Sequence, residues 1–274
     1  MLSSSLLFYV LAATATLAVP TAGEQAASQA ADTTSSQAGQ ATPVAAATAV
    51  SATSNAAQDE TTTNWAGVVL TFGQGAIVES VTGTFTVPTP NTPPGGDDHD
   101  LYTSAAWLGI DGYTCATALL RTGVEFIRVN GIVTATAWYE WYPSLARSYY
   151  KNFTVAPGDV ISATVTAGSP KNGVASIINT STGEQASVLL GGTQYASLCR
   201  ATGEWIVGDS SHPNGTEAPL PLPDFGNVTF SGAFASVYHP TNPVSNVLNI
   251  VHNGTTLTTV TTEYDTVTIE YIGK

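Results

Sequence analysis

Hydrophobic and polar residues alternate with a period of two through much of the chain after Thr61. In the stretches 81–87, 161–167 and 266–272 every second residue is apolar or glycine, which is typical of β-strands with one buried face. Gly, Pro, Asn and Asp interrupt these runs about every ten residues, and no stretch predicts an amphipathic helix longer than about two turns. We therefore expect residues 61–274 to form one all-β domain, a sandwich or a barrel.

The first 60 residues have a different composition. Residues 1–22 hold an apolar run from Leu6 to Val19 followed by a proline, which predicts a secretory signal peptide although no Lys or Arg stands near Met1. The run is too short to favour a membrane anchor. Residues 23–60 contain mainly Ala, Thr, Ser and Gln, so we expect a disordered leader or pro-segment, with a glycosylated linker as the alternative.

The net charge and the glycosylation sequons indicate the partners and the cellular location to expect. The formal net charge of −13, with only seven Lys and Arg, offers no basic surface to a polyanion, so we expect no nucleic-acid partner. Secretion and the absence of an anchor predict an extracellular protein that does not contact membranes after signal removal, and we expect a monomer. Five Asn-x-Ser/Thr sequons fit a secretory route as glycosylation sites: Asn152, Asn179, Asn214, Asn227 and Asn253.

The two cysteines, Cys115 and Cys199, predict a disulfide in a secreted domain. The bridge would close a loop of 84 residues (199 − 115), worth about 4 kcal/mol in the chain-entropy model. The cysteines and the four histidines lack metal-ligand spacing, and the acidic stretch 97–100 is most simply a solvated loop. We therefore expect neither a metal nor a cofactor. Neither a GxSxG nucleophile motif nor the paired Asp-Thr/Ser-Gly motifs of pepsin-like peptidases occur.

Four segments resemble the secreted glutamic peptidases of fungi, the eqolisins. They are TNWAGVVL at 63–70, AAWLGIDG with TCATALLRTGVEF between 105 and 126, AWYEWYP at 137–143, and SLCRATGEWIVGD at 197–209. The resemblance extends from Thr62 to about Ile272. It implies a concanavalin A-like sandwich of two curved, seven-stranded antiparallel sheets with one concave face. It also places Cys115 and Cys199 where the family has its disulfide.

The same resemblance implies a catalytic mechanism that this sequence does not preserve. In the family, a glutamate is general base and then general acid, while a glutamine amide positions the water and stabilises the oxyanion. Carried over by position, the glutamine corresponds to Arg121 and the glutamate to Gly208. Arginine cannot accept a hydrogen bond from water, and loss of the general base costs roughly 10²–10⁴ in rate. We therefore expect no hydrolysis by the family mechanism.

Two other carboxylates, Glu204 and Glu140, are candidates to replace the missing base. Glu204 shares a strand face with Gly208 but lies about 13 Å along the strand, at ~3.3 Å per residue. Glu140 matches a glutamate that the family keeps near its cleft. It is either a substitute carboxylate or, the interpretation we favour, the ion-pair partner of Arg121, because pairing lowers the cost of burying both charges.

Aromatic residues are the candidate ligand contacts. Trp65 and Trp107 match the cleft tryptophans of the family, and Trp138 and Tyr139 lie in its aromatic string, although alternation sends some of these side chains to the core. Three functions remain open: a binding protein for a peptide, glycan or hydrophobic small molecule, an enzyme with repurposed chemistry, and an active acid endopeptidase that uses a substitute carboxylate such as Glu140.

Overall fold

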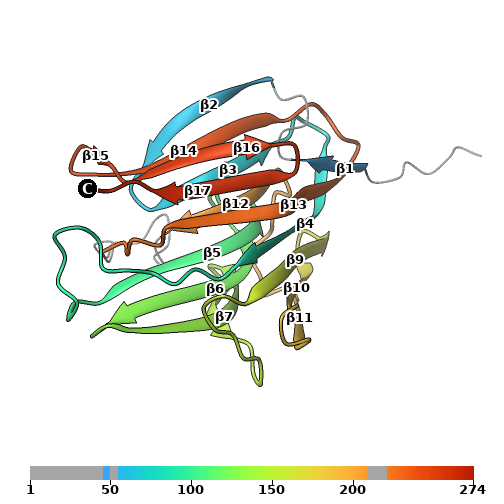
Figure 1. Ribbon diagram of the computed structural model, residues 1–274. Helices are drawn as coiled ribbons and strands as arrows, with labels where there is room; N and C mark the ends of the chain where they lie inside the picture. The colour runs from blue at the N-terminus through green and yellow to red at the C-terminus, as the bar shows by residue number, and fades with distance from the viewer. Residues whose placement is uncertain (1–45, 50–54, 209–220) are drawn as a thin grey trace, which may run out of the picture. The chain divides into compact units, whose positions relative to one another are not determined.

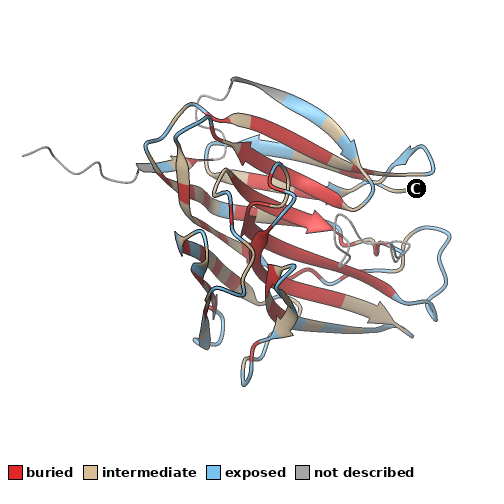
Figure 2. Ribbon diagram, turned by 180° about the vertical axis from the view of Figure 1, so that it is seen from behind, coloured by how far each residue is buried: buried red, intermediate tan, exposed pale blue. Residues whose placement is uncertain are grey.

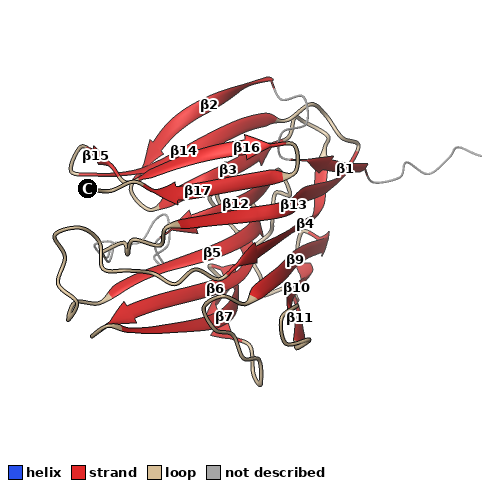
Figure 3. Ribbon diagram, viewed as in Figure 1, coloured by secondary structure: helices blue, strands red, loops and turns tan. Residues whose placement is uncertain are grey.

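The computed structural model describes residues 46–49, 55–208 and 221–274. Within these residues the regular secondary structure consists of β-strands, and no helix occurs (Figures 1 and 3). The expected signal peptide, most of the expected leader and the sequon at Asn214 lie outside these residues. No helix that is long and apolar enough to cross a membrane occurs in the described ranges.

The first of the two sheets has eight strands. Its order across the sheet is β11 (Gln185–Gly191), β10 (Asn172–Asn179), β9 (Val160–Ser169), β4 (Ile77–Thr86), β13 (Asn227–Tyr238), β17 (Thr266–Tyr271) and β16 (Thr258–Glu263). The short β1 (Ala46–Ala49) pairs with β13. All of these pairs are antiparallel, as the alternation pattern and the short turns predict.

The second sheet has nine strands. Its order is β15 (Thr255–Thr256), β14 (Val244–His252), β3 (Trp65–Thr71), β12 (Thr202–Gly208), β5 (Tyr102–Ile110), β6 (Leu119–Val129), β7 (Ile132–Tyr142) and β8 (Leu145–Tyr149). The remaining strand, β2 (Asn55–Thr62), runs parallel to β14. The predicted sandwich is confirmed, but the predicted seven strands per sheet are exceeded, by β1 in one sheet and by β2 and the two-residue β15 in the other.

The main core lies between the two sheets. Phe85 of β4 and Phe230 of β13 pack with their ring centroids 5.1 Å apart. Trp205 of β12 reaches across the layer and donates its indole N–H to the carbonyl oxygen of Thr82 at 2.8 Å. Burial is concentrated in the central strands of both sheets (Figure 2). Side chains on the opposite face of the nine-stranded sheet form a second, separate buried cluster.

Strands β1 and β2 correct the expectation of a wholly disordered leader. Ala46–Ala49 pairs with β13, and Asn55–Thr62 pairs with β14 over most of its length. An edge strand gains main-chain hydrogen bonds from a sheet that already exists, so it needs few apolar side chains of its own. The expectation of disorder was based on the low apolar content of residues 23–60. Apolar content does not predict whether a segment pairs with the edge of an existing sheet.

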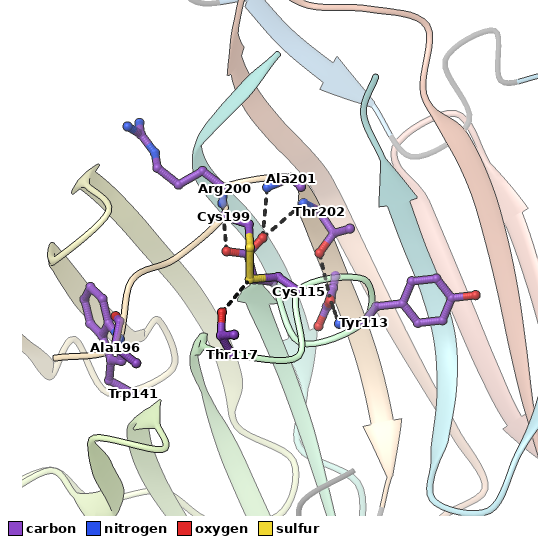
Figure 4. The surroundings of a disulfide bond; sticks show 11 residues. Tyr113, Cys115, Thr117, Trp141, Ala196, Cys199, Arg200, Ala201 and Thr202 are labelled. Atoms are coloured by element: carbon purple, nitrogen blue, oxygen red, sulfur yellow. Dashed lines mark hydrogen bonds between the residues drawn. A yellow bond between two sulfur atoms is a disulfide. The ribbon is translucent and has the colours of Figure 1, made fainter. Parts of the chain in front are cut away.

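The expected disulfide joins Cys115 to Cys199, with an S–S distance of 2.04 Å (Figure 4). It ties the loop after β5 to the chain just before β12. Beside it, the buried carboxylate of Asp111 accepts main-chain N–H bonds from Arg200 at 2.8 Å and Ala201 at 2.9 Å. This loop therefore has a fixed position next to the first residues of β12.

Candidate functional site

The outer face of the nine-stranded sheet carries a cluster of buried aromatic and charged side chains, which we call the tryptophan face. Alternation places these side chains on the side of each strand that faces away from the eight-stranded sheet. Its members include Trp65 of β3, Glu204 and Ile206 of β12, Trp107 of β5, Arg121 of β6, Trp138 and Glu140 of β7, and Leu248 of β14.

An ion pair occupies the centre of the tryptophan face. Arg121 and Glu140 lie directly opposite each other in the β6–β7 register, and Nε of Arg121 is 2.7 Å from Oε2 of Glu140. Both side chains have no solvent exposure. The ion pair that the sequence favours is therefore present. A buried pair of this kind is costly to break, because removal of either residue leaves a buried charge without its counter-charge.

Two indole rings flank the guanidinium group. The Cζ atom of Arg121 lies 4.9 Å from the ring centroid of Trp107 and 5.2 Å from that of Trp138. Gly123 stands between these two tryptophans in the strand register. A Cβ atom at Gly123 would overlap the carbonyl oxygen of Ala106. The sequence Arg-Thr-Gly thus places a residue without a side chain between the two rings that contact the arginine.

Burial lowers the pKa of Arg121, and the neighbouring carboxylate of Glu140 opposes this shift. The guanidinium group keeps its charge because arginine is not deprotonated in proteins and because the Glu140 carboxylate lies 2.7 Å away. Cation–π contact with the two rings adds a second favourable interaction. This site therefore holds a fixed positive charge that donates hydrogen bonds and accepts none.

Gly208 ends β12 at the border of the tryptophan face. It pairs with Trp65 of β3 and with Ala105 of β5, and its carbonyl oxygen accepts a hydrogen bond from the Ser104 hydroxyl at 2.9 Å. A Cβ atom at this position would overlap the main-chain oxygen of Asn64. The main chain just before β3 thus stands where a side chain at residue 208 would begin.

Glu204 is a second buried carboxyl group on this face. Its Oε1 accepts hydrogen bonds from the Thr202 hydroxyl at 3.1 Å and from the Tyr113 N–H at 3.2 Å. Its Oε2 is buried without a hydrogen-bond partner in the described part of the chain. Burial raises the pKa of Glu204 well above its ordinary value, and the charge of Asp111 raises it further. The group is therefore protonated in acid and carries no charge there.

A second ion pair, which the sequence did not predict, lies at the β8 edge. Nη1 of Arg147 is 2.7 Å from Oε1 of Glu125, and its Cζ lies 4.3 Å from the ring centroid of Trp138. Alternation places Glu125 on the same face as Arg121, which was a usable signal. The position of Arg147 was not predictable in this way, because the β7–β8 register shifts between Tyr139 and Trp141.

Three indole N–H groups of the tryptophan face are buried with no hydrogen-bond partner in the described ranges: those of Trp65, Trp107 and Trp138. The two tryptophans of the main core differ, because Trp141 donates to Ala196 and Trp205 to Thr82. Buried donors in native proteins are nearly always satisfied.

A pocket of about 210 Å³ opens beside Trp65 and is lined by Thr62, Asn64, Trp65, Gly112, Tyr113, Ala116 and Leu248.

The structure brings three of the four predicted cleft aromatics together. Trp65 and Trp107 contact each other at a centroid distance of 4.9 Å, and Trp138 lies across Arg121 from Trp107. The prediction is wrong for Tyr139, which points to the opposite side of β7, packs against the main core and contacts the Tyr150 ring at a centroid distance of 4.9 Å. The cause is the period of two, which separates the faces of Trp138 and Tyr139.

The sequons differ in accessibility. Asn152, Asn227 and Asn253 are exposed and stay predicted glycosylation sites. The prediction is wrong for Asn179, whose side chain has no solvent exposure. Its Nδ2 atom, to which a glycan would be attached, donates hydrogen bonds to Asp159 at 2.8 Å and to the Thr154 carbonyl at 3.2 Å.

Comparisons with known proteins agree with this architecture. Residues 63–271 match the Peptidase A4 family. The chain is 36% identical over 230 residues to aspergillopepsin-2 of Aspergillus niger, which covers 78% of the chain and 79% of that protein. It is 36% identical over 160 residues to scytalidopepsin B of Scytalidium lignicola, which covers 58% of the chain and 56% of that protein.

Two solved structures extend the comparison. Scytalido-glutamic peptidase with a transition state analog inhibitor superposes with a TM-score of 0.63 at 30% identity, over 77% of this chain and 98% of that one. Aspergilloglutamic peptidase from Aspergillus niger superposes with a TM-score of 0.56 at 35% identity, over 62% of this chain and 99% of that one.

Proposed function

The chain belongs to the Peptidase A4 family, and from this premise we propose that it is a secreted member that does not hydrolyse peptides by the family mechanism and binds a ligand on its tryptophan face. The proposal depends on the two positions that correspond to the catalytic glutamine and glutamate, which are Arg121 and Gly208 here.

The observation that carries the proposal is the Arg121–Glu140 ion pair. The pair fills the place of a neutral amide with a guanidinium group that cannot accept a hydrogen bond from water and is fixed by a carboxylate and two indole rings. Glu140, the best substitute for the missing base, is bound to Arg121 in the same contact. A carboxylate held in a buried ion pair is a poor proton acceptor, because protonation would break the pair.

Position 208 supports the same conclusion. A glycine transfers no proton, and the oxygen of Asn64 occupies the space that its Cβ would need. Glu204 shares the face but lies about 13 Å along β12 at ~3.3 Å per residue. A carboxyl group at that distance from position 208 does not replace a base that must contact the attacking water.

The ligand is proposed from the pocket of about 210 Å³ beside Trp65, because the three indole N–H groups themselves are buried. Trp65 and Tyr113 give the pocket aromatic walls, and Thr62 and Asn64 give it polar groups. A peptide, a glycan or an oxygen-bearing hydrophobic small molecule makes both kinds of contact.

The test is digestion of an acid-denatured protein near pH 3 by the purified chain, with aspergillopepsin-2 as the positive control. We expect no cleavage by the unmodified chain. Arg121→Gln combined with Gly208→Glu should restore cleavage only if β3 moves away from residue 208, so Gly208→Ala serves as a steric control and the melting temperature of each variant is measured alongside.

Cleavage by the unmodified chain would contradict the proposal. If that cleavage disappears in Glu140→Gln while the variant stays folded, the chain is an acid endopeptidase with Glu140 as its substitute carboxylate. If no cleavage is found, binding screens with peptides and oligosaccharides, followed by analysis of any bound compound for chemical change, distinguish a binding protein from a repurposed enzyme.

A further inference from the structure

Strand β11 is an edge strand that lacks the features which normally keep an edge from pairing with another chain. It is the last strand of the eight-stranded sheet and pairs with β10 alone in the described ranges (Figure 1). Natural edge strands are usually short, bulged or charged, or they contain proline. β11 has seven residues, QASVLLG, without charge or proline, and its register with β10 continues without a shift. Its outward main-chain groups are therefore available to a further strand.

The other edge strands of the described part of the chain carry such protection. β8 contains Arg147 and has a shifted register with β7. β2 contains Asp59 and Glu60, and β16 ends at Glu263. β1 and β15 are short, with four and two residues. Among the described strands, β11 is therefore the long edge that is open to pairing.

Two hollows lie along this edge, one on each face of the sheet. The outer hollow has a volume of about 400 Å³ and is lined by Ser176, Ile178, Gln185, Ala186 and Ser187. The inner hollow has a volume of about 230 Å³ and is lined by residues of both sheets, which are Tyr139, Tyr149, Tyr150, Lys151 and residues 186–188. A strand added to β11 would direct its side chains alternately to the two faces, and so into the two hollows.

The side chains of β11 itself fit these hollows. Leu189 is 80% exposed on the outer face, whereas Val188 and Leu190 on either side of it pack on the main core. When a second copy of β11 pairs antiparallel with the first about an axis at Val188, residue 189 of each copy lies opposite residue 187 of the other. Leu189 of each copy then lies over the outer hollow of the other, beside Ser187. The two Val188 side chains meet at the inner hollow.

Charges at the two ends of β11 are complementary in the same arrangement. Glu184 stands just before the strand, and the Lys171 ammonium group donates to the Thr193 carbonyl oxygen just after it, at 3.2 Å. In the antiparallel pair, position 184 of one copy lies opposite position 192 of the other. Each Glu184 carboxylate therefore comes close to Lys171 of the second copy. Hydrogen bonds from Thr154 lower the pKa of Glu184, so this carboxylate keeps its charge in mild acid.

We propose that this edge is a dimer interface, in which the β11 strands of two copies pair antiparallel about a two-fold axis at Val188 and join the eight-stranded sheets into one continuous sheet. Both copies use the same strand, so the interface is closed and gives dimers without longer assemblies. The dimer replaces the monomer expected from the sequence, whose alternation does not show which strand lies at an edge. The proposal does not depend on the function of the tryptophan face, which belongs to the other sheet.

The association is tested by sedimentation velocity of the full chain over a range of concentrations, where we expect an equilibrium between monomer and dimer. Leu189→Lys should weaken the dimer more than about tenfold, because the symmetry removes the contact twice and lysine opposes pairing at an edge. Leu189 is exposed, so the variant should keep its melting temperature. Ile132→Lys is the matched control, because it makes the same change at an apolar residue of β7 that is 64% exposed, and it should leave the dimer unchanged.

The register is tested by cross-linking under mild oxidation, followed on a non-reducing gel. Val188→Cys should form a disulfide between two copies, because the two residues face each other across the axis. Ser187→Cys is the control, because its two copies lie diagonally, at about 7–8 Å, and should cross-link much less. Equal or preferential cross-linking of Ser187→Cys contradicts the proposed axis.

Three results overturn the dimer. One is a monomer at every concentration up to the millimolar range. Another is a dimer that Leu189→Lys leaves unchanged or that Ile132→Lys weakens equally, because the contact then lies elsewhere or depends only on charge. The third is a monomer that binds an added extended peptide and loses this binding in Leu189→Lys, which would assign the edge to a foreign partner. None of these results bears on hydrolysis or ligand binding at the tryptophan face, so the two proposals fail separately.

Discussion

At the scale of single residues, the tryptophan face is defined by charges that have little access to water. Arg121 and Glu140 neutralise each other, and Glu204 is kept neutral in acid by its burial. Among the residues that the structure describes, the face therefore contains ionisable groups but no free carboxylate at its centre to act as a base. Each of these groups makes a measurable contribution to stability, and the direction follows from its surroundings.

Arg121→Gln tests the ion pair. The variant leaves Glu140 buried without its cation, so we expect a loss of about 3–5 kcal/mol in unfolding free energy and no gain of peptidase activity. Arg128→Gln is the control, because the Arg128–Asp98 pair is largely exposed on the aspartate side, at 62%. Exposed pairs contribute little to stability, because water screens both charges. Denaturant titration measures both variants, and an active, fully stable Arg121→Gln variant would refute the expectation.

Glu204→Gln tests the pH dependence of stability. Because burial raises the pKa of Glu204 in the folded state, its contribution is fully present below the unfolded pKa of about 4.3 and is lost as pH rises towards the folded pKa. The loss approaches about 1.4 kcal/mol per pH unit in that window. The glutamine side chain of the variant cannot titrate and keeps an acceptor for the Thr202 hydroxyl, so the variant should lose less stability above about pH 5. Equal pH slopes for the two proteins would show that Glu204 is not the cause.

At the scale of elements, the strands β5, β6 and β7 form the floor of the site because their register brings Trp107, Gly123 and Trp138 into one row. The alternation of each strand was predictable from the sequence, and it separates Trp107 and Trp138 from the main core. The assignment of Tyr139 to the cleft is wrong because a family motif does not say which of two adjacent aromatic residues faces the site, whereas the strand period does. The pairing of Arg147 with Glu125 was not predictable, because it depends on a shift of the β7–β8 register that no residue type in the sequence indicates.

Gly123→Ala tests the close approach of β5 and β6. The added Cβ would overlap the Ala106 oxygen and lie 2.6 Å from the Trp107 Cβ, so the strands must separate. Overpacking of this kind costs typically about 1–3 kcal/mol. Gly168→Ala in β9 is the matched control, since its nearest contact would be the Asn172 oxygen at 3.9 Å. Thermal unfolding should separate the two variants, and equal melting temperatures would argue against the tight row.

At the scale of the whole molecule, periodicity was sufficient for an all-β domain, the family resemblance for a sandwich, and the cysteine count for the disulfide. It was not sufficient for the boundary of the domain. Residues 55–60 have a composition typical of disorder, and they form a strand because the open edge of β14 offers hydrogen bonds. Order of this kind is set by the partner strand, so the composition of the segment alone does not predict it.

The disulfide makes a prediction at this scale. Replacing Cys115 and Cys199 together by alanine removes a constraint on a loop of 84 residues. In the chain-entropy model this costs between about 4 and 5 kcal/mol of unfolding free energy. Denaturant titration of the double variant checks the value. A loss below about 1 kcal/mol would mean that the hydrogen bonds of Asp111 to the chain at Arg200 and Ala201 hold the loop without the bridge.

The five tryptophans form two groups in different parts of the molecule, and each group can be followed by fluorescence. All five are buried, so the folded chain should emit at short wavelength and resist quenching by iodide. Trp141 and Trp205 belong to the layer between the sheets, whereas Trp65, Trp107 and Trp138 belong to the tryptophan face. A ligand on that face would change the emission of three indoles and leave two unchanged, so fluorescence distinguishes occupancy of the site from unfolding of the sandwich.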